Sequence, residues 1–345
     1  MDISEFDYDL PEELIAQSPL LERDSSRMLV VRPRERNWLD AQFADFADYL
    51  RAGDVVVVNN TRVFPARFVG TRKGTGGRIE ILLVREIETL TWEALVRNSS
   101  RLQQGTIVRF GESNAVVELI DAPGAEMRLV RFNSEADFEH LLTVNGQVPL
   151  PPYIKRLGGT TSADEERYQT VYAKERGAIA APTAGLHFTS RIFDQLRRLG
   201  VEIVEVTLHV GYGTFEPVRS PLVSAHRVRA EAFEISAMAA NVINASRSAG
   251  GRVVAIGTTT TRALESAIKS DGTLQPVSSL ADLTITPGYD FQVTDALLTN
   301  FHLPRSSLIL LVAAFAGREL ILNAYAHAIR QRYRFYSYGD CMLII

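Results

Sequence analysis

The stretch GDVVVVNNTR, residues 53–62, decides how this chain is organised. Four consecutive valines at 55–58 are typical of a strand buried on both faces of a sheet, because a half-buried strand would alternate apolar and polar side chains. The polar residues Asn59, Asn60 and Thr61 follow directly and predict a loop at the carboxyl end of that strand. We therefore expect an α/β domain built around a central buried strand.

A similar pattern returns beyond Tyr153. There the sequence alternates between strand and helix signals, and in such sheets ligands gather beyond the carboxyl ends of the strands. We therefore expect a site at that edge. The patterns predict strands over residues 178–181, 201–208, 252–257 and 296–299, with helices over 190–199, 236–248, 260–269 and 306–315.

The middle of the chain has a different periodicity. From Arg67 to about Arg131, short alternating segments are separated by glycine or polar turns, which is typical of a small antiparallel barrel or sandwich. We predict a discontinuous α/β main domain, residues 1–65 and 151–345, with a small antiparallel β-barrel domain, residues 66–150, inserted into it. The expected strands of the insert cover residues 78–84, 91–97, 106–110, 115–119 and 127–132.

Composition agrees with a soluble cytoplasmic enzyme without requiring one. The single cysteine, Cys341, excludes an intramolecular disulfide and a cysteine-cluster metal site. The first ten residues are acidic and lack an apolar core, so no secretory signal is expected there. The longest strongly apolar run, residues 308–316, is too short to span a bilayer and favours a buried helix. We therefore expect no membrane role.

Net charge is −4, but it is divided unevenly along the chain. Residues 1–65 carry −6, residues 66–150 carry −1 and residues 151–345 carry +3. All but four of the 37 basic residues are arginine, which suits phosphate binding and base stacking, although genome composition would have the same effect. Near the C-terminus Arg332 and Arg334 alternate with aromatic residues, a mixture that can combine phosphate contact with stacking on unpaired bases. A solvated helix end beside core aromatics is the competing interpretation.

Three blocks in the second half combine a histidine with residues that control the backbone. His187 lies in APTAGLHFT (181–189), His209 in TLHVGYGTF (207–215) and His302 in TNFHLP (299–304). Histidine can move protons near neutral pH, and neighbouring glycine or proline sets the backbone around it. Three such coincidences favour a constructed polar site over three separately buried core histidines, and both interpretations stay open.

Further blocks are FDYDLPEELIAQ (6–17), RDSSRMLVV (23–31) and YQTVYA (168–173). Together with those above, they make the chain resemble the S-adenosylmethionine:tRNA ribosyltransferase-isomerase family of queuosine biosynthesis, the QueA family. The resemblance is weakest between about residues 69 and 150. Two departures are visible: Tyr212 stands in a Gly-Tyr-Gly triplet where members usually read Gly-Ala-Gly, and Arg229 lies in a segment that often carries a second histidine after the equivalent of His226. Any role of that second histidine is therefore open here.

The resemblance implies a specific reaction. The enzyme would move the ribosyl part of S-adenosylmethionine onto 7-aminomethyl-7-deazaguanine at the tRNA wobble position and isomerise it, giving epoxyqueuosine-tRNA with release of adenine and methionine. S-adenosylmethionine would be consumed as the ribosyl donor, and no cofactor is expected. The partner would be the anticodon stem-loop that carries the aminomethyl base, and the protein is expected to be a monomer. The resemblance also implies the same division into a main domain and an inserted domain.

This chemistry needs groups that move protons. A sulfonium acidifies the neighbouring carbon, so a positioned base could start the reaction, and the departing adenine needs a proton or a hydrogen bond. His187 and His209 are the first candidates, followed by Tyr168, Tyr172 and Asp340. Hydrogen bonding to ribose or to the backbone is the competing interpretation of each histidine.

Substrate binding is expected from three kinds of residue. Threonine hydroxyls and asparagine amides can bind ribose or base edges, glycines let a ligand approach the backbone, and arginines can contact phosphate. The helix that follows Gly257 also offers free N–H groups. For each glycine a plain turn, and for Asn59, Asn60 and Arg62 loop capping, are the competing interpretations. The candidates are Asn59, Asn60, Arg62, Thr183, Gly185, Gly211, Gly213, Thr214, Gly257, Thr258, Thr259, Arg262, Asn300, His302, Arg332 and Arg334.

Other classes are weighed on the same residues. A metal site is not expected, because the histidines are widely spaced and no HxxxH, HxH or cysteine pair is present. A methyltransferase would use the same sulfonium donor, but no G-x-G-x-x-G follows a strand. An RNA-binding scaffold would explain the arginines and the β insert, but not the histidine-containing blocks.

Overall fold

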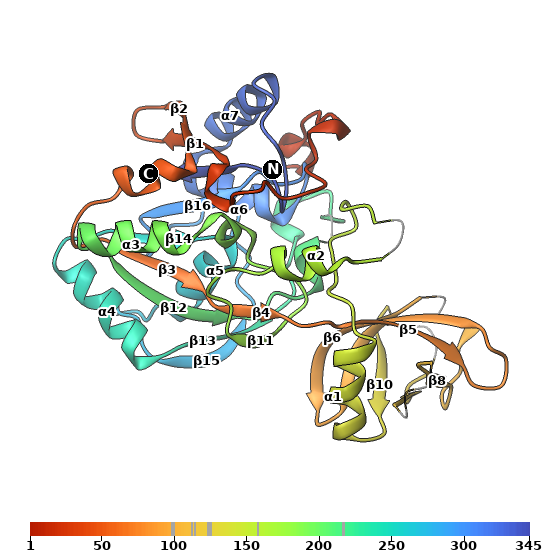
Figure 1. Ribbon diagram of the computed structural model, residues 1–345. Coiled ribbons are helices and arrows are strands. Elements are labelled where there is room, and N and C mark those ends of the chain that lie inside the picture. Colours follow the sequence, from red (N-terminus) through yellow and green to blue (C-terminus); the bar gives the residue numbers. More distant parts are fainter. Residues whose placement is uncertain (98–100, 112, 114, 123–125, 157–158, 216–217) are drawn as a thin grey trace.

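The computed structural model describes residues 1–345 except 98–100, 112, 114, 123–125, 157–158 and 216–217 (Figure 1). Its main body is a nine-stranded mixed sheet covered by helices, and a closed six-stranded barrel lies below this body in the view of Figure 1. The strand order in the large sheet is β15-β13-β12-β3-β14-β16-β17-β1-β2. The predicted α/β class with an antiparallel β-barrel is confirmed.

The valine run forms the centre of the large sheet. Strand β3 (Val55–Asn59) lies between β12 (Glu202–Leu208) and β14 (Val253–Ile256), and both neighbours are parallel to it. Because side chains alternate along a strand, Val55 and Val57 enter one hydrophobic core while Val56 and Val58 enter another on the opposite face. Two cores on one strand make a three-layer domain.

Helices cover both faces of this sheet. The core that holds Val56 also contains residues of α3 (Ser190–Leu199) and the 3-10 helix η4 (Phe43–Tyr49). The core that holds Val55 contains residues of four other helices of the main body. These are α4 (Ala237–Ser248), α5 (Thr258–Ala267), α6 (Ser307–Ala316) and α7 (Arg318–Arg330).

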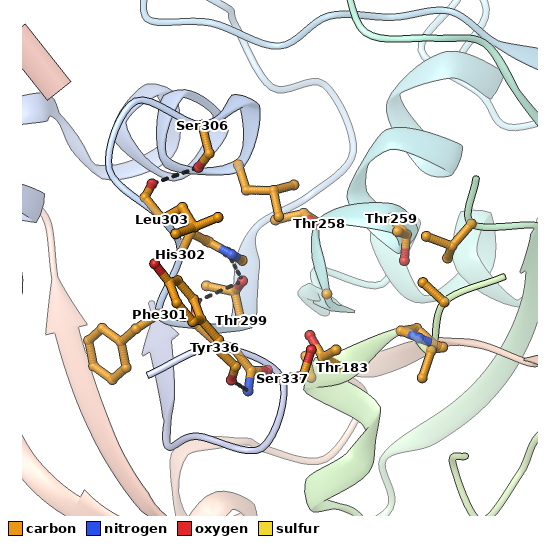
Figure 2. A pocket seen from close by; sticks show the side chains of 18 of the residues that line it. Thr183, Thr258, Thr259, Thr299, Phe301, His302, Leu303, Ser306, Tyr336 and Ser337 are labelled. Atoms are coloured by element: carbon orange, nitrogen blue, oxygen red, sulfur yellow. Dashed lines mark hydrogen bonds between the residues drawn. The ribbon is translucent and has the colours of Figure 1, made fainter. Parts of the chain in front are cut away.

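The carboxyl ends of the parallel strands meet at one edge, hereafter the carboxyl edge. Strand β16 (Ala296–Asn300) is parallel to β14, and β17 (Cys341–Ile344) runs antiparallel to β16 and parallel to β1 (Arg27–Arg32). The starts of β17 and β1 therefore lie at the edge where β3 and β16 end. Figure 2 shows part of this edge from close by. The outer strands are β2 (Asn37–Gln42), β13 (Glu231–Ile235) and β15 (Val277–Ala281).

The barrel is closed by pairing β9 with β10, so it leaves no edge strand open. Helix α1 (Glu135–Val144) packs Phe138 on Trp92 and Phe132 of the barrel. The chain enters and leaves the barrel side by side, since Arg67 bridges to Gln147. The domain boundaries at 65/66 and 150/151 remain a prediction. The barrel strands are β5 (Arg67–Arg72), β6 (Arg78–Glu88), β7 (Thr91–Val96), β8 (Ile107–Arg109), β9 (Val116–Leu119) and β10 (Arg128–Phe132).

One expected strand is wrong. Residues 178–181 do not form a strand of the large sheet, because β11 (Glu175–Ala178) ends at Ala178 after pairing with β4 (Thr61–Val63). The chain then turns through Pro182 into the 3-10 helix η6 (Thr183–His187). The remaining short helices among the described residues are α2 (Ser162–Arg167), η1 (Ile3–Phe6), η2 (Glu12–Leu14), η3 (Arg23–Ser25), η7 (Tyr212–Phe215) and η8 (Val223–Ala225).

The apolar run near residue 308 forms α6, which is mostly buried in the main core. Within the described part of the chain, no single helix is long and apolar enough to cross a membrane. Helices α6 and α7 reach the length and composition only as a pair, and they are bent by 114° relative to each other.

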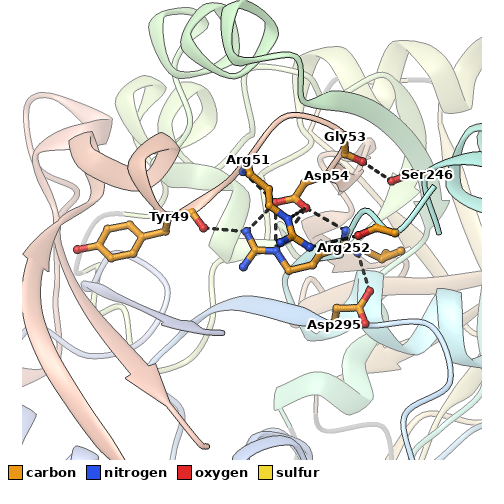
Figure 3. Close-up of polar contacts among 9 residues, drawn as sticks. Tyr49, Arg51, Gly53, Asp54, Ser246, Arg252 and Asp295 are labelled. Atoms are coloured by element: carbon orange, nitrogen blue, oxygen red, sulfur yellow. Dashed lines mark hydrogen bonds and ion pairs between the residues drawn. The ribbon is translucent and has the colours of Figure 1, made fainter. Parts of the chain in front are cut away.

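A buried ion pair holds the opposite edge of the parallel strands together (Figure 3). Asp54 is fully buried at the start of β3 and accepts hydrogen bonds from the backbone N–H of Arg51 (3.0 Å) and of Arg252 (2.9 Å). The Arg252 guanidinium also donates to the same carboxylate, with Nη2 at 2.6 Å. Burial by itself raises the pKa of Asp54, but the hydrogen bonds from Arg252 outweigh it and hold that pKa below its ordinary value.

Replacing Asp54 by asparagine should lower the free energy of unfolding by about 3 kcal/mol, because the Arg252 charge loses its partner. This is the lower end for such pairs, since the Arg252 side chain remains 28% exposed. Urea unfolding followed by circular dichroism measures the change. As a control, Asp194→Asn removes the exposed pair with Arg197 and should cost at most about 1 kcal/mol. Equal, small effects of both variants would contradict the structural role of Asp54.

Candidate active site

A pocket opens at the carboxyl edge, hereafter the central pocket (Figure 2). It lies beyond the ends of β14 and β16, and its empty space, part of which is open solvent at the mouth, is about 670 Å³. None of its lining side chains carries a formal charge. On one side of the pocket, the ring centroids of Tyr153 and Tyr336 lie 4.6 Å apart. The other lining residues that matter here are Thr183, Gly257, Thr258, Thr259, Thr299, Asn300, His302, Ser306 and Ser337.

The start of α5 forms one wall of this pocket. Gly257 has φ of 93°, a conformation that favours glycine, and the helix begins at the next residue. The first N–H groups of a helix have no partner within the helix, so they are available to a ligand. Thr258 and Thr259 place hydroxyls in the same first turn, and Figure 2 shows them across the space from Ser337 and Thr183. The wall therefore offers several neutral hydrogen-bonding groups.

Opposite α5, the residues after β16 are buried and polar. The His302 ring is hydrogen-bonded through Nε2 to Oγ1 of Thr299 at 2.7 Å, and burial lowers its pKa to about 3. The Asn300 side chain donates to the carbonyl of Tyr336 at 3.0 Å, while its Oδ1 is buried without a hydrogen bond to any described residue. At neutral pH this side of the pocket is uncharged.

His209 lines a different cavity, the interdomain cleft, between the barrel and the main domain. Its Nδ1 is 2.8 Å from Oγ1 of Thr61, and burial lowers its pKa although Glu175 and Glu234 raise it. Gly177 leaves room for the ring, because a Cβ there would lie 2.6 Å from it. The cleft also contains Phe64, Trp92, Glu93, Glu139, Arg176, Gly211, Tyr212, Gly213 and Arg229.

Gly211 is held by a buried ion pair. Its N–H donates to Oε1 of Glu231 at 2.8 Å, and the other carboxylate oxygen of Glu231 accepts from Arg262. Arg262 also donates to the carbonyls of Ala281 (2.8 Å) and Leu283 (3.2 Å). These contacts hold the Arg262 side chain in place, and a substrate contact of Arg262 stays a prediction. Gly213 also lies in the cleft, and the side chain of Thr214 lies outside the described part of the structure.

His187 lies in a third cavity, a small recess that shares Ser337 with the central pocket. Its Nδ1 is 2.8 Å from Oγ of Ser26, and its ring packs on Phe43. Burial lowers the pKa of His187 to about 4, although the neighbouring Asn300 side chain raises it. The three histidines therefore line three cavities, of which two adjoin each other, and the expected single histidine site is divided.

The two candidate tyrosines are deeply buried. Burial raises the pKa of Tyr168 and of Tyr172, so both hydroxyls stay protonated at neutral pH and can only donate or accept hydrogen bonds. Neither hydroxyl has a hydrogen-bond partner within normal geometry among the described residues. A Cβ at Gly185 would clash with the Tyr172 hydroxyl, so this glycine serves close packing. Neither tyrosine lines the central pocket.

Asp340 holds the loop before β17. Its carboxylate accepts from the backbone N–H groups of Arg27 (3.0 Å) and Arg334 (2.8 Å), and from the Arg27 guanidinium. This arrangement gives it a positioning role. Arg332 is exposed with φ of 56°, and its nearest carboxylate is Glu13 at 3.9 Å. Arg334 is half-buried beside the recess and donates to the carbonyl of Ser18.

The polar residues after β3 mostly hold the sheet edge. Asn59 donates to the Leu208 carbonyl (2.9 Å) and to Thr259 Oγ1 (3.3 Å), which ties β3 to β12 and α5. Asn60 accepts from the Thr207 hydroxyl at 2.8 Å. The Arg62 side chain is exposed on β4. These contacts agree with loop capping for both asparagines, and a substrate contact of Asn59, Asn60 or Arg62 stays a prediction.

Several functional candidates escaped the sequence reasoning. Tyr153, Tyr336 and Ser337 line the central pocket, and Ser26 contacts His187. Ser26 lies in RDSSRMLVV, a block that the family resemblance uses, so its position was available as a signal. Nothing in the local pattern around Tyr153 indicates that its ring meets Tyr336, 183 residues later.

No group of three or more histidine, cysteine, aspartate or glutamate side chains suited to a metal ion occurs among the described residues. Function without a metal stays a prediction.

The buried histidines should make the fold sensitive to acid. His302 has a folded pKa of about 3, below the unfolded value of about 6.5, so its stabilising effect is complete above pH 6.5 and is lost as pH falls. Between pH 7.5 and 5 the loss should be roughly 2 kcal/mol. Denaturant unfolding at both pH values should show a smaller pH effect in His302→Gln than in the wild type. The exposed His140 is the control, and His140→Gln should keep the wild-type dependence. Identical pH dependence in all three proteins would contradict the burial argument.

Comparison with known proteins agrees with this architecture. The model of the queuosine biosynthesis protein family matches residues 3–344. An S-adenosylmethionine:tRNA ribosyltransferase-isomerase from Pelotomaculum thermopropionicum is 50% identical over 345 residues, which is all of both chains, and one from Syntrophotalea carbinolica is 50% identical over 349 residues, again with both chains covered in full. The crystal structure of an S-adenosylmethionine tRNA ribosyltransferase from Thermotoga maritima is 32% identical, covers 99% of this chain and 100% of its own, and superposes with a TM-score of 0.56. This chain therefore belongs to the queuosine biosynthesis protein family.

Proposed function

We propose that this protein transfers the ribosyl moiety of S-adenosylmethionine onto 7-aminomethyl-7-deazaguanine at the tRNA wobble position and isomerises it, giving epoxyqueuosine-tRNA with release of adenine and methionine. The enzyme class, S-adenosylmethionine:tRNA ribosyltransferase-isomerase, rests on the full-length identities to relatives of that name. S-adenosylmethionine is consumed as the donor, and no cofactor is required. The RNA partner is the anticodon stem-loop, and the protein acts as a monomer.

The central pocket is the observation that carries this proposal. An adenosine group is neutral and carries ribose hydroxyls, base nitrogens and a flat aromatic face. In the pocket, the hydroxyls of Thr183, Thr258 and Ser337 can bind the ribose hydroxyls and the base nitrogens. The rings of Tyr153 and Tyr336 can pack on the aromatic face of the base. Because its lining side chains carry no formal charge, the pocket does not attract counter-ions that would compete with a neutral nucleoside. We therefore assign the donor's adenosine part to this pocket.

The proton transfers fall to His187 and His209. The pKa of each is lowered, so both imidazoles are neutral at pH 7 and can accept a proton. His187 has a buried Nε2 without a hydrogen bond and lies beside Asn300, which lines the central pocket. We propose it as the base that removes the proton next to the sulfonium. His209 faces the interdomain cleft, where it can accept a proton from the aminomethyl group, so that the incoming amine is neutral.

The cleft suits the RNA base. Its walls combine aromatic side chains such as Trp92 and Tyr212 with Glu93 and Glu139, which can attract an aminomethyl group. His209 and Val210 are adjacent in sequence, but His209 faces the cleft and Val210 faces the central pocket. The end of β12 thus separates a donor pocket from a base-binding cleft.

Given S-adenosylmethionine and tRNA carrying the aminomethyl base, the purified protein should release free adenine and methionine. Chromatography identifies both products. Unmodified tRNA without the aminomethyl base serves as the control and should give neither. Formation of S-adenosylhomocysteine together with a methylated RNA would place the protein among methyltransferases instead.

Replacing a proton-transfer histidine by glutamine keeps some hydrogen bonding but removes proton exchange near neutral pH. At least one of His187→Gln and His209→Gln should lower single-turnover adenine release by about 10²–10⁴-fold with both substrates still bound. His327→Gln is the matched control, because His327 lies on α7 and pairs with Asp40 away from the three cavities. Near-normal rates in both folded site variants would exclude these histidines as the proton-transfer groups.

A further inference from the structure

The recess beside the central pocket, hereafter the arginine recess, is built differently from its neighbour. Its walls include Arg23, Ser26, Arg167, His187, Ser337 and Tyr338. Arg334 lies next to it, since its guanidinium reaches the carbonyl of Ser18, and its charge helps to lower the pKa of His187. The central pocket has no charged wall, whereas this recess concentrates guanidinium groups.

These arginines are bonded to backbone carbonyls. Arg23 donates to the carbonyls of Leu186 and Glu166, each at 3.2 Å. Arg167 donates to the carbonyls of Leu20 (2.7 Å) and Leu21 (3.0 Å). Within the described part of the chain, Arg23, Arg167 and Arg334 form no ion pair with a carboxylate. Carbonyls hold the guanidinium groups in place but do not neutralise them.

Several buried donors around the recess are also unsatisfied. Nε of Arg167 and Nη1 of Arg334 are buried and have no hydrogen-bond partner among the described residues. The Tyr338 hydroxyl has none either. Buried polar atoms are nearly always hydrogen-bonded, and unpaired charged donors are strongly disfavoured. Their gathering around one small cavity indicates that an acceptor belongs there.

The local charge balance is positive. Two carboxylates act on these arginines, Glu166 near Arg23 and Asp340 near Arg334. Asp340 is already engaged by Arg27 and by the loop backbone, and Glu166 is exposed. Burial, together with the charge of Arg167, lowers the pKa of Arg23. Burial and the charge of Arg27 lower the pKa of Arg334. An arginine nevertheless stays charged at neutral pH. The recess therefore favours an anion.

We propose that the arginine recess binds a backbone phosphate of the RNA substrate close to the nucleotide that is modified. This rests on the proposed function, which places the RNA at this edge. Guanidinium groups bind phosphate oxygens through two parallel hydrogen bonds, and such contacts fix the position of a nucleic acid without reading its sequence. A phosphate here would lie next to the central pocket, because Ser337 lines both cavities.

The donor's carboxylate is the other possible source of an oxyanion. S-adenosylmethionine carries that carboxylate beside an ammonium group and a sulfonium, so it is a net cation. Three guanidinium groups around one recess would repel the rest of the molecule. An RNA phosphate has no cation attached to it, and the flanking phosphates add to the attraction. The charge of the recess therefore favours RNA.

The test uses a fluorescently labelled anticodon stem-loop RNA and a potassium chloride series. Arg167→Gln and Arg23→Gln should each weaken binding about ten-fold or more, and the slope of log affinity against log salt should fall by about 0.7–0.9 per lost phosphate contact. Arg167→Lys keeps the charge and should retain most of the slope. S-adenosylmethionine affinity, measured by calorimetry, should change less than two-fold.

Arg247→Gln is the matched control. Arg247 is also half-buried and donates to two backbone carbonyls, those of Gly272 (2.6 Å) and Gln292 (2.7 Å), but it lies in the last turn of α4 at the opposite edge of the sheet. Its replacement should leave RNA binding and the salt slope unchanged. A similar loss in this variant would mean that the effect is structural and would overturn the proposal.

Two further results would also overturn it. One is an unchanged RNA affinity and salt slope in folded Arg23 and Arg167 variants, and the other is a selective loss of S-adenosylmethionine affinity. Adenine release by the wild type separates this inference from the proposed function. If the wild type releases adenine and binds the stem-loop while the variants bind it equally well, only the phosphate site is wrong. If the wild type releases no adenine, the proposed function fails first.

Discussion

Burial of β3 on both faces is the constraint on which the rest of the structure depends. A strand with valines on both sides is stable only when each face is covered, so the chain must supply two cores and two layers of helices. The strand pairs in parallel with β12 and β14, so the carboxyl ends of these three strands lie at the same edge, and parallel pairing requires a crossover between neighbours. Asp54 secures the start of this strand, and Asn59 secures its end.

The carboxyl edge then divides charge between neighbouring cavities. The central pocket is lined by neutral side chains, whereas the arginine recess collects guanidinium groups with carbonyl partners. A nucleoside and a polyanion are best separated in this way, because the arginines attract RNA without lining the pocket that we assign to the donor. Ser337, which lines both cavities, belongs to the loop that Asp340 ties down.

Burial also determines what the histidines can do. His187 and His302 are deeply buried, and their pKa values of about 4 and 3 keep both rings neutral at pH 7. Neutral imidazoles suit proton removal beside a sulfonium better than proton donation, since an acid would need its charged form to be populated. His302 bonds to Thr299 and lines the pocket, while His187 keeps Nε2 without a partner. This difference favours His187 for chemistry and His302 for shape.

The sequence by itself determined the α/β class and the barrel-like insert, because these follow from periodicity, which is local, and it predicted a site at the carboxyl edge, where the central pocket lies. The helix predicted over 190–199 matches α3, whose bounds are set by the Thr189 cap and by Gly200 in the left-handed region. Strands β17 and β1 were not predicted. Each is identified by its pairing with strands that are distant in the sequence, and local periodicity does not show that pairing. The tertiary structure alone decided that His187, His209 and His302 line separate cavities, that Arg262 pairs with Glu231, and that Arg23, Arg167 and Arg334 surround one recess. Such groupings join residues up to 311 positions apart, and the local pattern of residue types carries no record of which distant side chains will share a cavity.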